Sequence, residues 1–247
     1  MIKLSEISSD APKGIDEEEA KDRLDEISEK IAELGEKMYA QKKHSLLVVF
    51  QGMDSSGKDG TTEKVFRNCS PAFCCAYSFK KPTPEEFGHD FLWRVHKHAP
   101  RKGNIQIFIR SHYEDILIQR VHNWIDENRV TQRINAINAF ERLLQEDNHT
   151  TILKFYMHLS YERQGEKLQE RIDEKDKNWK HNPGDWEERK KWDEYIHAYE
   201  DAINRSEIPW IIVPVDQRWY RNYFVAKKVL EAMEKMDLEW PKLAENE

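Results

Sequence analysis

Leu46-Leu-Val-Val-Phe50 is an apolar, partly β-branched run with the length of a strand buried on both faces of a sheet. The chain continues as Gln51-Gly-Met-Asp-Ser-Ser-Gly-Lys58-Asp-Gly-Thr-Thr62, which contains the spacing Gly-x4-Gly-Lys and leads into a segment able to form a helix. A lone Gly-x4-Gly-Lys could arise by chance. Preceded by a strand and followed by a helix, it favours a phosphate-binding loop over an ordinary strand–turn–helix connection.

The residue types of this loop suit phosphate. Gly52 and Gly57 allow backbone N–H groups to curl around phosphate oxygens, and the N-terminus of the next helix adds a partial positive charge. Lys58 would reach the outer phosphates. The loop therefore predicts a site for a chain or group of phosphates.

Two residues depart from the common form of the loop. Asp59 follows the lysine where a Ser or Thr that holds magnesium usually stands, and Asp54 lies inside the loop. A bare carboxylate there would repel phosphate. We therefore interpret Asp54 as a Mg²⁺ ligand or as a group that positions a phosphate nucleophile. An Asx turn that stabilises the loop is the alternative interpretation.

Composition limits the classes of function. The 247 residues (29.5 kDa) allow one α/β domain with an appended subdomain. The formal net charge of -7 gives no overall basic field that would attract nucleic acid, so a polyanion has to be met by a local cationic groove. Cys69, Cys74 and Cys75 are interpreted as small buried apolar residues. No apolar stretch could span a bilayer and residues 1–10 lack a signal-peptide core, so we expect a cytoplasmic protein without membrane binding.

Periodicity outside the loop predicts alternating helices and strands. Residues 1–15 carry little pattern and are expected to be a loose lead-in. A helix over residues 16–43 has an apolar stripe, which packs either on its own domain or on a second subunit; we favour the first. Further strands are predicted at residues 73–79 (buried), 104–109, 151–159 and 210–215, and further helices at 58–68, 84–95, 131–147, within 161–204 and at 219–236. This alternation predicts an α/β fold with a parallel sheet and helices on both faces, in one domain over residues 1–247.

Cationic residues follow several predicted strands. Lys80 and Lys81 follow the second strand, and Arg110 and His112 follow the third. Ligands of an open parallel sheet bind beyond the carboxyl ends of its strands. A single surface cation is usually only a solvated charge, but recurrence at one rim favours an anion site.

The third strand ends without the usual carboxylate. Phosphate-loop enzymes commonly place an Asp there to hold the magnesium shell, and this chain has Ile109. The metal would then rely on Asp54, with Glu114 or Asp115 as outer-shell helpers. A capping box from Ser111 to Glu114, opening a helix, is an alternative role for Glu114. His112 could bind phosphate or be structural, and Lys180 beside Trp179 could be a lid contact or an exposed helix-end charge.

Eight segments, in order, resemble the family-2 polyphosphate kinases, in particular the class that acts on both nucleoside mono- and diphosphates. The resemblance runs from about Leu46 to Pro241. It is carried by Gly52-Met-Asp-Ser-Ser-Gly-Lys-Asp-Gly-Thr61, Phe79-Lys-Lys-Pro-Thr83, His89-Asp-Phe-Leu-Trp-Arg94, Arg110-Ser-His-Tyr-Glu-Asp115, Asn178-Trp-Lys180, Trp192-Asp-Glu-Tyr195, Pro209-Trp210 and Trp219-Tyr-Arg-Asn222.

The resemblance implies a three-layer, thymidylate-kinase-like P-loop kinase fold with a five-stranded parallel sheet and a helical lid over residues 160–204. It also implies reversible transfer of the terminal phosphate of polyphosphate to AMP or ADP, which yields ADP or ATP, with Mg²⁺, in a homodimer or homotetramer. Asp54 would be the metal ligand, and Lys58 and Arg110 would stabilise charge on the transferred group. Contacts to polyphosphate or nucleotide are implied for Gly52, Ser55, Ser56, Gly57, Asp59, Gly60, Thr61, Lys80, Lys81, Arg94, His112, Tyr113, Glu114, Arg120, Arg171 and Lys180.

Two other functions are compatible with the residues. An ATP-dependent nucleotide kinase could use the same fold and the same loop. A catalytically weak protein that binds polyanions is the second alternative, because the family has Asp or Asn where this chain has Ile109.

Overall fold

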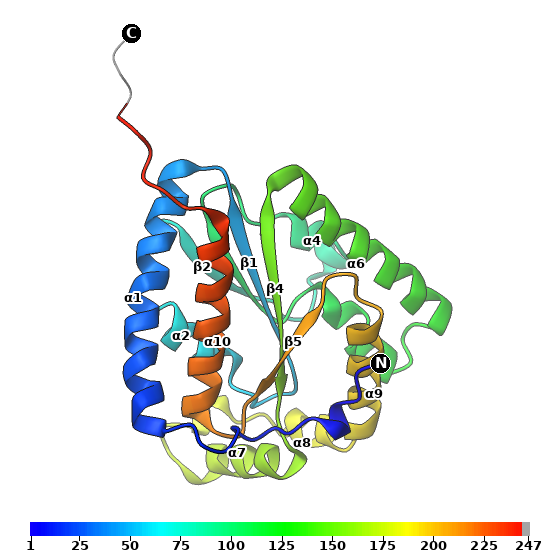
Figure 1. Ribbon diagram of the computed structural model, residues 1–247. Helices are drawn as coiled ribbons and strands as arrows, with labels where there is room; N and C mark the ends of the chain where they lie inside the picture. Colours follow the sequence, from blue (N-terminus) through cyan, green and yellow to red (C-terminus); the bar gives the residue numbers. More distant parts are fainter. Residues whose placement is uncertain (244–247) are drawn as a thin grey trace.

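A five-stranded parallel sheet forms the middle layer of the computed structural model, which describes residues 1–243 (Figure 1). The strand order is β2-β3-β1-β4-β5. The predicted parallel sheet and P-loop kinase fold are confirmed. The strands are β1 (Ser45–Gln51), β2 (Cys74–Ser78), β3 (Ile105–Ile109), β4 (Thr150–His158) and β5 (Trp210–Pro214).

The central strand β1 is buried along its whole length, as its apolar run predicts. Its side chains alternate between the two faces of the sheet, because successive residues of a strand point to opposite sides. Leu47 and Val49 enter one hydrophobic cluster, whereas Leu46, Val48 and Phe50 enter the other. β1 therefore holds both helical layers to the sheet and places the loop that follows it at the edge of both cores.

Three helices cover the first face: α1 (Glu17–Gln41), α2 (Lys58–Val65) and α10 (Arg218–Met233), the last extended by the 3₁₀ turn η4 (Glu234–Met236) (Figure 1). The Asp16 side chain caps α1 by accepting a hydrogen bond from the Glu19 N–H at 2.9 Å. The stripe of α1, including Leu24, Ile31 and Met38, packs within this cluster and against α10. The interpretation that the stripe serves its own domain is confirmed.

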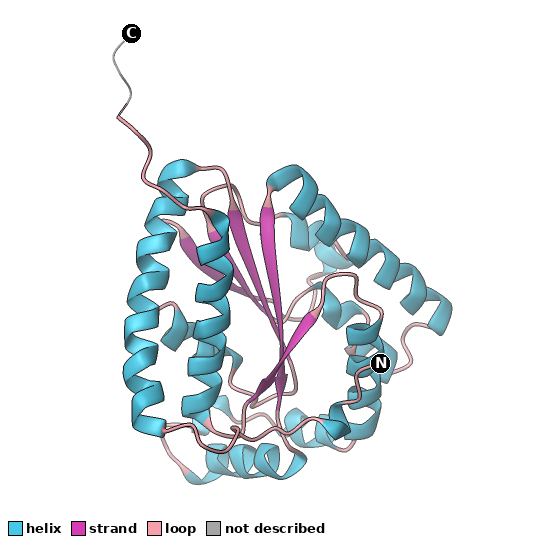
Figure 2. Ribbon diagram, viewed as in Figure 1, coloured by secondary structure: helices cyan, strands magenta, loops and turns pink. Residues whose placement is uncertain are grey.

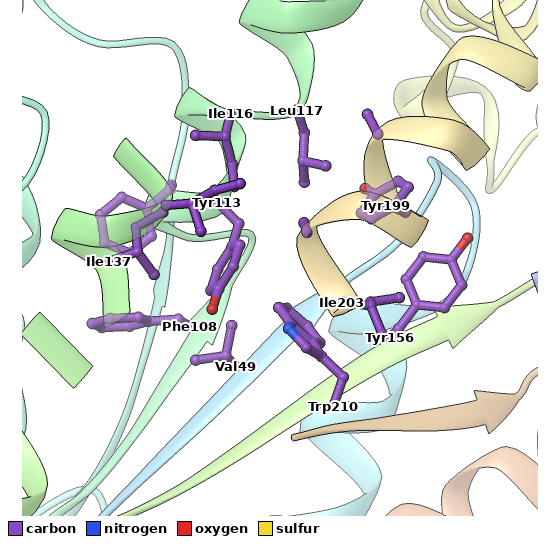
Figure 3. Packing of buried hydrophobic residues seen from close by; sticks show 14 of the residues in the cluster. Val49, Phe108, Tyr113, Ile116, Leu117, Ile137, Tyr156, Tyr199, Ile203 and Trp210 are labelled. Carbon is purple, nitrogen blue, oxygen red and sulfur yellow. The ribbon is translucent and has the colours of Figure 1, made fainter. Parts of the chain in front are cut away.

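Helices and turns cover the second face, as Figure 2 shows. Figure 3 shows side chains of this cluster, among them Val49, Phe108, Tyr113, Tyr199 and Trp210. The elements are α4 (Trp93–His96), η2 (His112–Asp115), α5 (Ile118–Val121), α6 (Glu127–Asn148) and α9 (Trp192–Asn204), and the short α3 (Pro84–Phe87), which has no buried residue, precedes α4.

The segment that was predicted to be a helical lid crosses the end of the sheet where the strands finish (Figure 1). It consists of α7 (Tyr161–Asp173), η3 (Asn178–Lys180) and α8 (Pro183–Arg189). The predicted lid included residues 192–204, but α9 belongs to the body of the domain, because Ala198, Tyr199, Ala202 and Ile203 are buried in the second core.

The N-terminal segment is not the loose lead-in that was predicted. It forms a 3₁₀ turn η1 (Leu4–Glu6), and Leu4 is only 1% exposed. The Leu4 N–H donates to Glu200 Oε1 at 2.7 Å, and the Asp216 N–H donates to the Ser9 carbonyl at 3.1 Å. The prediction was wrong because the partners that order this segment, Glu200 and Asp216, lie far along the chain and leave no local pattern.

Two other predictions of burial were wrong. β2 is an edge strand with half-exposed and exposed side chains, and Cys75 is exposed. Phe87, expected on an apolar helix face, is 77% exposed, because the predicted helix is broken into the short α3 and α4. Nowhere in residues 1–243 is a helix both long and apolar enough to cross a membrane.

Candidate active site

The predicted phosphate loop connects β1 to α2, and its backbone requires glycine at two positions. Gly52 has φ 147°, and a β-carbon there would lie 2.8 Å from the Met157 carbonyl oxygen. Gly57 has φ 89°, and a β-carbon there would lie 1.8 Å from Nη1 of Arg221. At both positions φ is positive and a neighbouring atom leaves no room for a β-carbon. Only glycine tolerates this combination.

Lys58 is the first residue of α2 and lies inside the loop. It is 6% exposed, and its Nζ donates to the carbonyls of Gly52 (2.8 Å) and Met53 (3.0 Å) and to Ser56 Oγ (3.3 Å). Burial lowers the pKa of Lys58 to about 8, since the charge of Asp54 offsets only part of the desolvation. The ammonium is thus held where a bound phosphate would stabilise its charged form.

Asp54 and Arg110 form an ion pair beside Lys58. Arg110 immediately follows β3 with φ 60°, a strained conformation for a residue other than glycine, and its Nη2 donates to Asp54 Oδ1. Their side chains are 31% and 39% exposed, so the pair opens to solvent. Burial tends to raise the pKa of Asp54, but the charges of Arg110 and Lys58 outweigh it and hold the pKa below the usual value. Asp54 is therefore an ionised carboxylate at the mouth of the loop.

Glu114 lies deeper in the same site, and its predicted capping box is absent. Ser111 caps the 3₁₀ turn η2 by accepting from the Tyr113 N–H at 3.2 Å. The Gln51 amide, oriented to satisfy its partners, donates to Glu114 Oε1 at 2.9 Å. Burial raises the pKa of Glu114, although the charges of Arg110 and Lys58 oppose the shift. Glu114 is thus a site residue, placed by β1 and not by a helix cap.

Asp54 is the carboxylate inside the loop, whereas Glu114 lies deeper beside Gln51 and Asp185 of α8 is held by Arg171. In residues 1–243 no group of three His, Cys, Asp or Glu side chains could hold a metal by itself. Ile109 is 8% exposed and packs in the first core, and Asp115 is turned away to Gln119, whose Nε2 lies 2.6 Å from its Oδ1. The outer-shell role predicted for Asp115 is therefore wrong. Mg²⁺ is usually held by one or two carboxylates together with substrate phosphates, so this donor set fits a metal that arrives with its substrate.

The lid contacts the loop through α7. Gln164 Nε2 donates to the carbonyl of Asp54 at 3.1 Å, and Arg171 Nη1 donates to Asp185 Oδ2 at 2.6 Å. The charge of Arg171 also contributes to the low pKa of Asp54, so Arg171 lies near the site, as predicted. Lys180 is exposed, with its Nζ 4.9 Å from the centre of the Trp179 ring, and no contact joins it to the loop in the described part of the chain.

His112 and Tyr113 do not face the loop, so the phosphate contacts that were predicted for their side chains are wrong. Both side chains are buried against Glu141: its Oε1 lies 3.2 Å from His112 Nε2 and 3.0 Å from Tyr113 Oη. Lys154 Nζ completes the cluster at 2.6 Å from Glu141 Oε2. The short η2 turns both rings toward the second core, where Figure 3 shows Tyr113 among apolar side chains.

Arg94 and Arg120 are paired with carboxylates, and their contacts to polyphosphate or nucleotide stay predictions. Arg94 donates to Glu86 Oε2 (3.2 Å) and to the Lys80 carbonyl (2.8 Å). Arg120 donates to Asp201 Oδ2 (2.9 Å) and to Glu127 Oε1 and Oε2 (2.7 and 2.6 Å). Arg94 thereby fixes the backbone of the exposed Lys80–Lys81 pair, and Arg120 ties α5 to α6 and α9.

The remaining loop positions differ in whether their side chains can reach the loop cavity. Thr61 is buried and its hydroxyl donates to Asn222 Oδ1 at 3.3 Å, so this side chain faces α10 and not the loop cavity, contrary to prediction. Asp59 is exposed on the outside of α2. Ser55 has φ 68°, and its buried Oγ has no hydrogen-bond partner within residues 1–243. The Ser55 hydroxyl is therefore available to a phosphate oxygen.

Arg221 is a site residue that the sequence analysis did not select. The residue is 3% exposed, its guanidinium lies against Gly57 and Gly60, and Nε donates to Asn222 Oδ1 at 3.1 Å. Among the described residues no carboxylate lies within 4.0 Å of it, which is rare for a buried Arg. Burial, and next the charge of Arg218, lowers the pKa of Arg221 to about 10. Its signal was position: Arg221 follows the fifth strand, at the same rim as Arg110.

Comparisons with known proteins agree with one another. The family profile described as Polyphosphate kinase 2 matches residues 14–241. A protein of Meiothermus ruber named AMP/ADP-polyphosphate phosphotransferase is 43% identical over 218 residues, covering 87% of this chain and 81% of that protein. A Rhodopseudomonas palustris protein named ADP-polyphosphate phosphotransferase is 36% identical over 228 residues, covering 86% of this chain and 78% of that protein. A crystal structure of Polyphosphate Kinase 2 from Arthrobacter aurescens TC1 aligns with a TM-score of 0.96 and 36% identity, over 99% of this chain and 89% of that one.

Proposed function

The chain belongs to the polyphosphate kinase 2 family, and we propose that it transfers the terminal phosphate of polyphosphate to AMP or ADP, reversibly and with Mg²⁺. The observation that carries the proposal is the Asp54–Arg110 pair beside Lys58 in the phosphate loop. Relatives that cover most of the chain bear names of AMP- and ADP-polyphosphate phosphotransferases. Polyphosphate and these nucleotides are accordingly the proposed substrates.

Each residue of the site has a part in this reaction. An oxygen of the terminal nucleotide phosphate forms a bond to the terminal phosphorus of polyphosphate, the bond from that phosphorus to the next bridging oxygen breaks, and the shortened chain leaves with the electron pair. Asp54 orients the accepting phosphate. Lys58 and Arg110 stabilise the charge on the transferred group, which is the main demand of phosphoryl transfer.

The loop backbone and the metal complete the charge balance. Backbone N–H groups of the loop and the start of α2 would hold the donor phosphates, and the Ser55 hydroxyl can add one more hydrogen bond. Mg²⁺, when bound by Asp54 and phosphate oxygens, supplies further charge neutralisation. Since Ile109 contributes no ligand, Asp54 is the protein carboxylate proposed for this role.

A matrix of donors and acceptors tests the proposal. The purified chain is incubated with Mg²⁺, with polyphosphate or ATP as donor, and with AMP or ADP as acceptor. We expect ADP and ATP to form with polyphosphate. Turnover with ATP as the donor of AMP but none with polyphosphate would favour the ATP-dependent nucleotide kinase. Tight, salt-sensitive polyphosphate binding without turnover would favour the non-catalytic polyanion-binding protein, the alternative that Ile109 suggests.

Replacing the loop lysine tests its role in catalysis, and a second lysine of the same helix gives the matched control. Lys58→Ala should lower kcat by about a hundredfold or more if Lys58 stabilises the transition state. Lys64→Ala removes an exposed lysine from the same helix and should leave kcat unchanged. An unchanged rate in Lys58→Ala would remove Lys58 from the mechanism.

The proposed assembly and compartment are separate from the chemistry. A homodimer or homotetramer in the cytoplasm stays a prediction. Light scattering of the purified protein tests the assembly, and a mass equal to one chain would contradict it.

A further inference from the structure

Gln164, near the start of α7, is a buried polar residue that touches the phosphate loop. It is only 1% exposed. Its Nε2 donates to the carbonyl of Asp54 at 3.1 Å, and its Oε1 accepts from Nη1 of Arg189 at 2.9 Å. Because a carbonyl only accepts and a guanidinium only donates, one orientation of the amide satisfies both partners. The Gln164 side chain is therefore fixed between the loop and α8.

Arg189, the last residue of α8, holds the Gln164 amide in this orientation. Its Nη1 also donates to the Tyr161 carbonyl at 2.6 Å, and its Cζ lies 3.3 Å from the centre of the Tyr161 ring. The guanidinium packs against Gly165 of α7, where a β-carbon would lie 3.0 Å from Nη2. Glycine is unfavourable inside a helix, and the space that Arg189 needs explains why it stands at this position.

The end of α8 is itself tied to the body of the domain. Glu188, next to Arg189, accepts from Tyr195 Oη at 2.6 Å, and both of its carboxylate oxygens lie 3.0 Å from His122 Nε2. Tyr195 belongs to α9, and His122 follows α5. Arg189 therefore starts from an anchored position, and Gln164 connects the phosphate loop to it.

The contact of Gln164 fixes the peptide group between Asp54 and Ser55. This peptide bond is trans, so its carbonyl oxygen and its N–H point in opposite directions. Since the Asp54 carbonyl faces α7, the Ser55 N–H points away from α7. Neither this N–H nor the buried Ser55 hydroxyl has a hydrogen-bond partner within residues 1–243. Ser55 also has φ 68°, a strained conformation that persists only where neighbouring groups hold it. Two free donors on one loop residue indicate a bound anion.

We propose that Gln164, oriented by Arg189, is a positioning residue for phosphoryl transfer: it turns the Asp54–Ser55 peptide so that the Ser55 N–H binds a phosphate oxygen. The inference rests on the proposed function and adds to it two residues outside the loop. If the Gln164 amide is lost, the peptide is free to turn over and to present its carbonyl oxygen to the phosphate, which repels it. The backbone that carries the Asp54 carboxylate then also loses its support.

Replacing Gln164 tests the hydrogen bond to the loop. Gln164→Met removes the donor without adding a charge, and Gln164→Glu removes the donor but keeps the acceptor for Arg189. We expect kcat/KM for polyphosphate to fall about tenfold or more in both, and KM for ADP to change less than about twofold. Gln169→Met is the matched control, because Gln169 is exposed on the same helix and contacts Asp173; it should keep full activity. Unchanged kcat/KM in Gln164→Met, or an equal loss in Gln169→Met, would overturn the inference.

Replacing Arg189 tests the orientation of the amide. Arg189→Met leaves the Gln164 amide free to turn, so kcat/KM for polyphosphate should fall about threefold. In the double variant with Gln164→Met it should cause no further loss, because both residues act through one hydrogen bond. Lys190→Met removes the exposed neighbour of Arg189 and is the control. Losses that multiply in the double variant would show that Arg189 acts through another contact, contrary to the inference.

Binding of inorganic triphosphate, measured without nucleotide, separates this inference from the proposed function. We expect its Kd to rise about tenfold in Gln164→Met and to stay unchanged in Gln169→Met. Should Gln164→Met fail to fold, Gln164→Glu retains the Arg189 contact and gives the same readouts. A raised Kd in a chain that shows no turnover of polyphosphate would support the role of Gln164 and contradict the proposed function. An unchanged Kd together with normal turnover would overturn the role of Gln164 and leave the proposed function intact.

Discussion

The guanidinium of Arg221 occupies the space beside Gly57 that a side chain would need: a β-carbon on Gly57 would lie 1.8 Å from Nη1 and 2.6 Å from Cζ of Arg221. Two segments far apart in the chain therefore meet without a side chain between them. The contact brings a buried positive charge against the loop backbone at the point where α2 begins, and it makes the conformation of the loop depend on α10.

Gly57→Ala should therefore abolish most activity. The added methyl group has to displace a buried guanidinium, and the positive φ is strained for alanine as well. We expect kcat/KM for polyphosphate to fall by about a hundredfold or more, since displacing the loop removes its aligned N–H donors. Gly14→Ala is the control for a positive φ outside the loop: Gly14 has φ 89° too, but nothing lies within 4 Å of its added β-carbon. Gly14→Ala should keep full activity, and equal activity in both variants would contradict the role of the Arg221 contact.

Activity should fall at alkaline pH as Lys58 loses its proton. The pKa of Lys58 in the free enzyme is about 8, below its usual value of 10.5, so the ammonium that binds phosphate is present below pH 8 and is lost above it. We expect kcat/KM for polyphosphate to decrease about tenfold per pH unit above that point. Lys167 has a similar pKa, so the profile is also measured with Lys167→Gln, which should keep the decrease. A profile that is flat up to pH 10 would show that Lys58 stays protonated.

The same lowered pKa has the opposite effect on the stability of the fold, which should rise with pH where activity falls. Because the pKa of Lys58 is lower in the folded chain than in the unfolded one, the unfolded state binds more protons between about pH 8 and 10.5. The contribution of Lys58 to the free energy of unfolding therefore increases with pH across this window. Lys58→Met should remove that contribution, which urea unfolding at pH 7 and pH 10 can measure.

Local sequence patterns were sufficient to predict the phosphate loop. Which of the cations have carboxylate partners depends on contacts between elements that are distant in the chain. The strand at Leu46 to Phe50 and the glycine-rich loop after it are contiguous in sequence, so periodicity and spacing were sufficient to place Lys58. Whether a cation is free depends on partners from distant elements. Arg120 is neutralised by Asp201, whereas Arg221 finds no carboxylate in the described residues, and neither fact has a local signal.

The type of turn after Arg110 explains why the predictions for His112 and Tyr113 were wrong. Pattern analysis expected a helix with a capping box after Arg110, but a 3₁₀ turn forms there and directs His112 and Tyr113 into the core. Both turn types begin with the same kind of cap, since Ser111 accepts a backbone hydrogen bond in either. The sequence therefore located the start of the element correctly, whereas the direction of its side chains required the structure.

Ile109→Asp should raise the affinity of the enzyme for Mg²⁺. Ile109 ends β3 next to Arg110, and a carboxylate there could join Asp54 in holding Mg²⁺. We expect the Mg²⁺ concentration for half-maximal activity to fall several-fold, on the order expected when one ligand is added. Because Ile109 is 8% exposed and packs in the first core, the same change should lower stability by about 1–3 kcal/mol. Ile109→Val is the control for packing, and an unchanged Mg²⁺ dependence in Ile109→Asp would show that residue 109 does not reach the metal.

Lys154→Met should destabilise the fold far more than it affects catalysis. Lys154 and Glu141 are a fully buried ion pair with 2.6 Å between Nζ and Oε2, and their side chains are 0% and 1% exposed. Removing the lysine leaves the carboxylate of Glu141 buried with only neutral donors, which typically costs about 3–5 kcal/mol. The double variant Lys154→Met, Glu141→Gln removes both charges and should recover part of the loss. Urea unfolding measures the free energies, and kcat of the folded protein should stay near that of the unmodified chain, because this cluster faces the core and not the loop. A large loss of kcat in the double variant would show instead that the cluster positions Arg110 through η2.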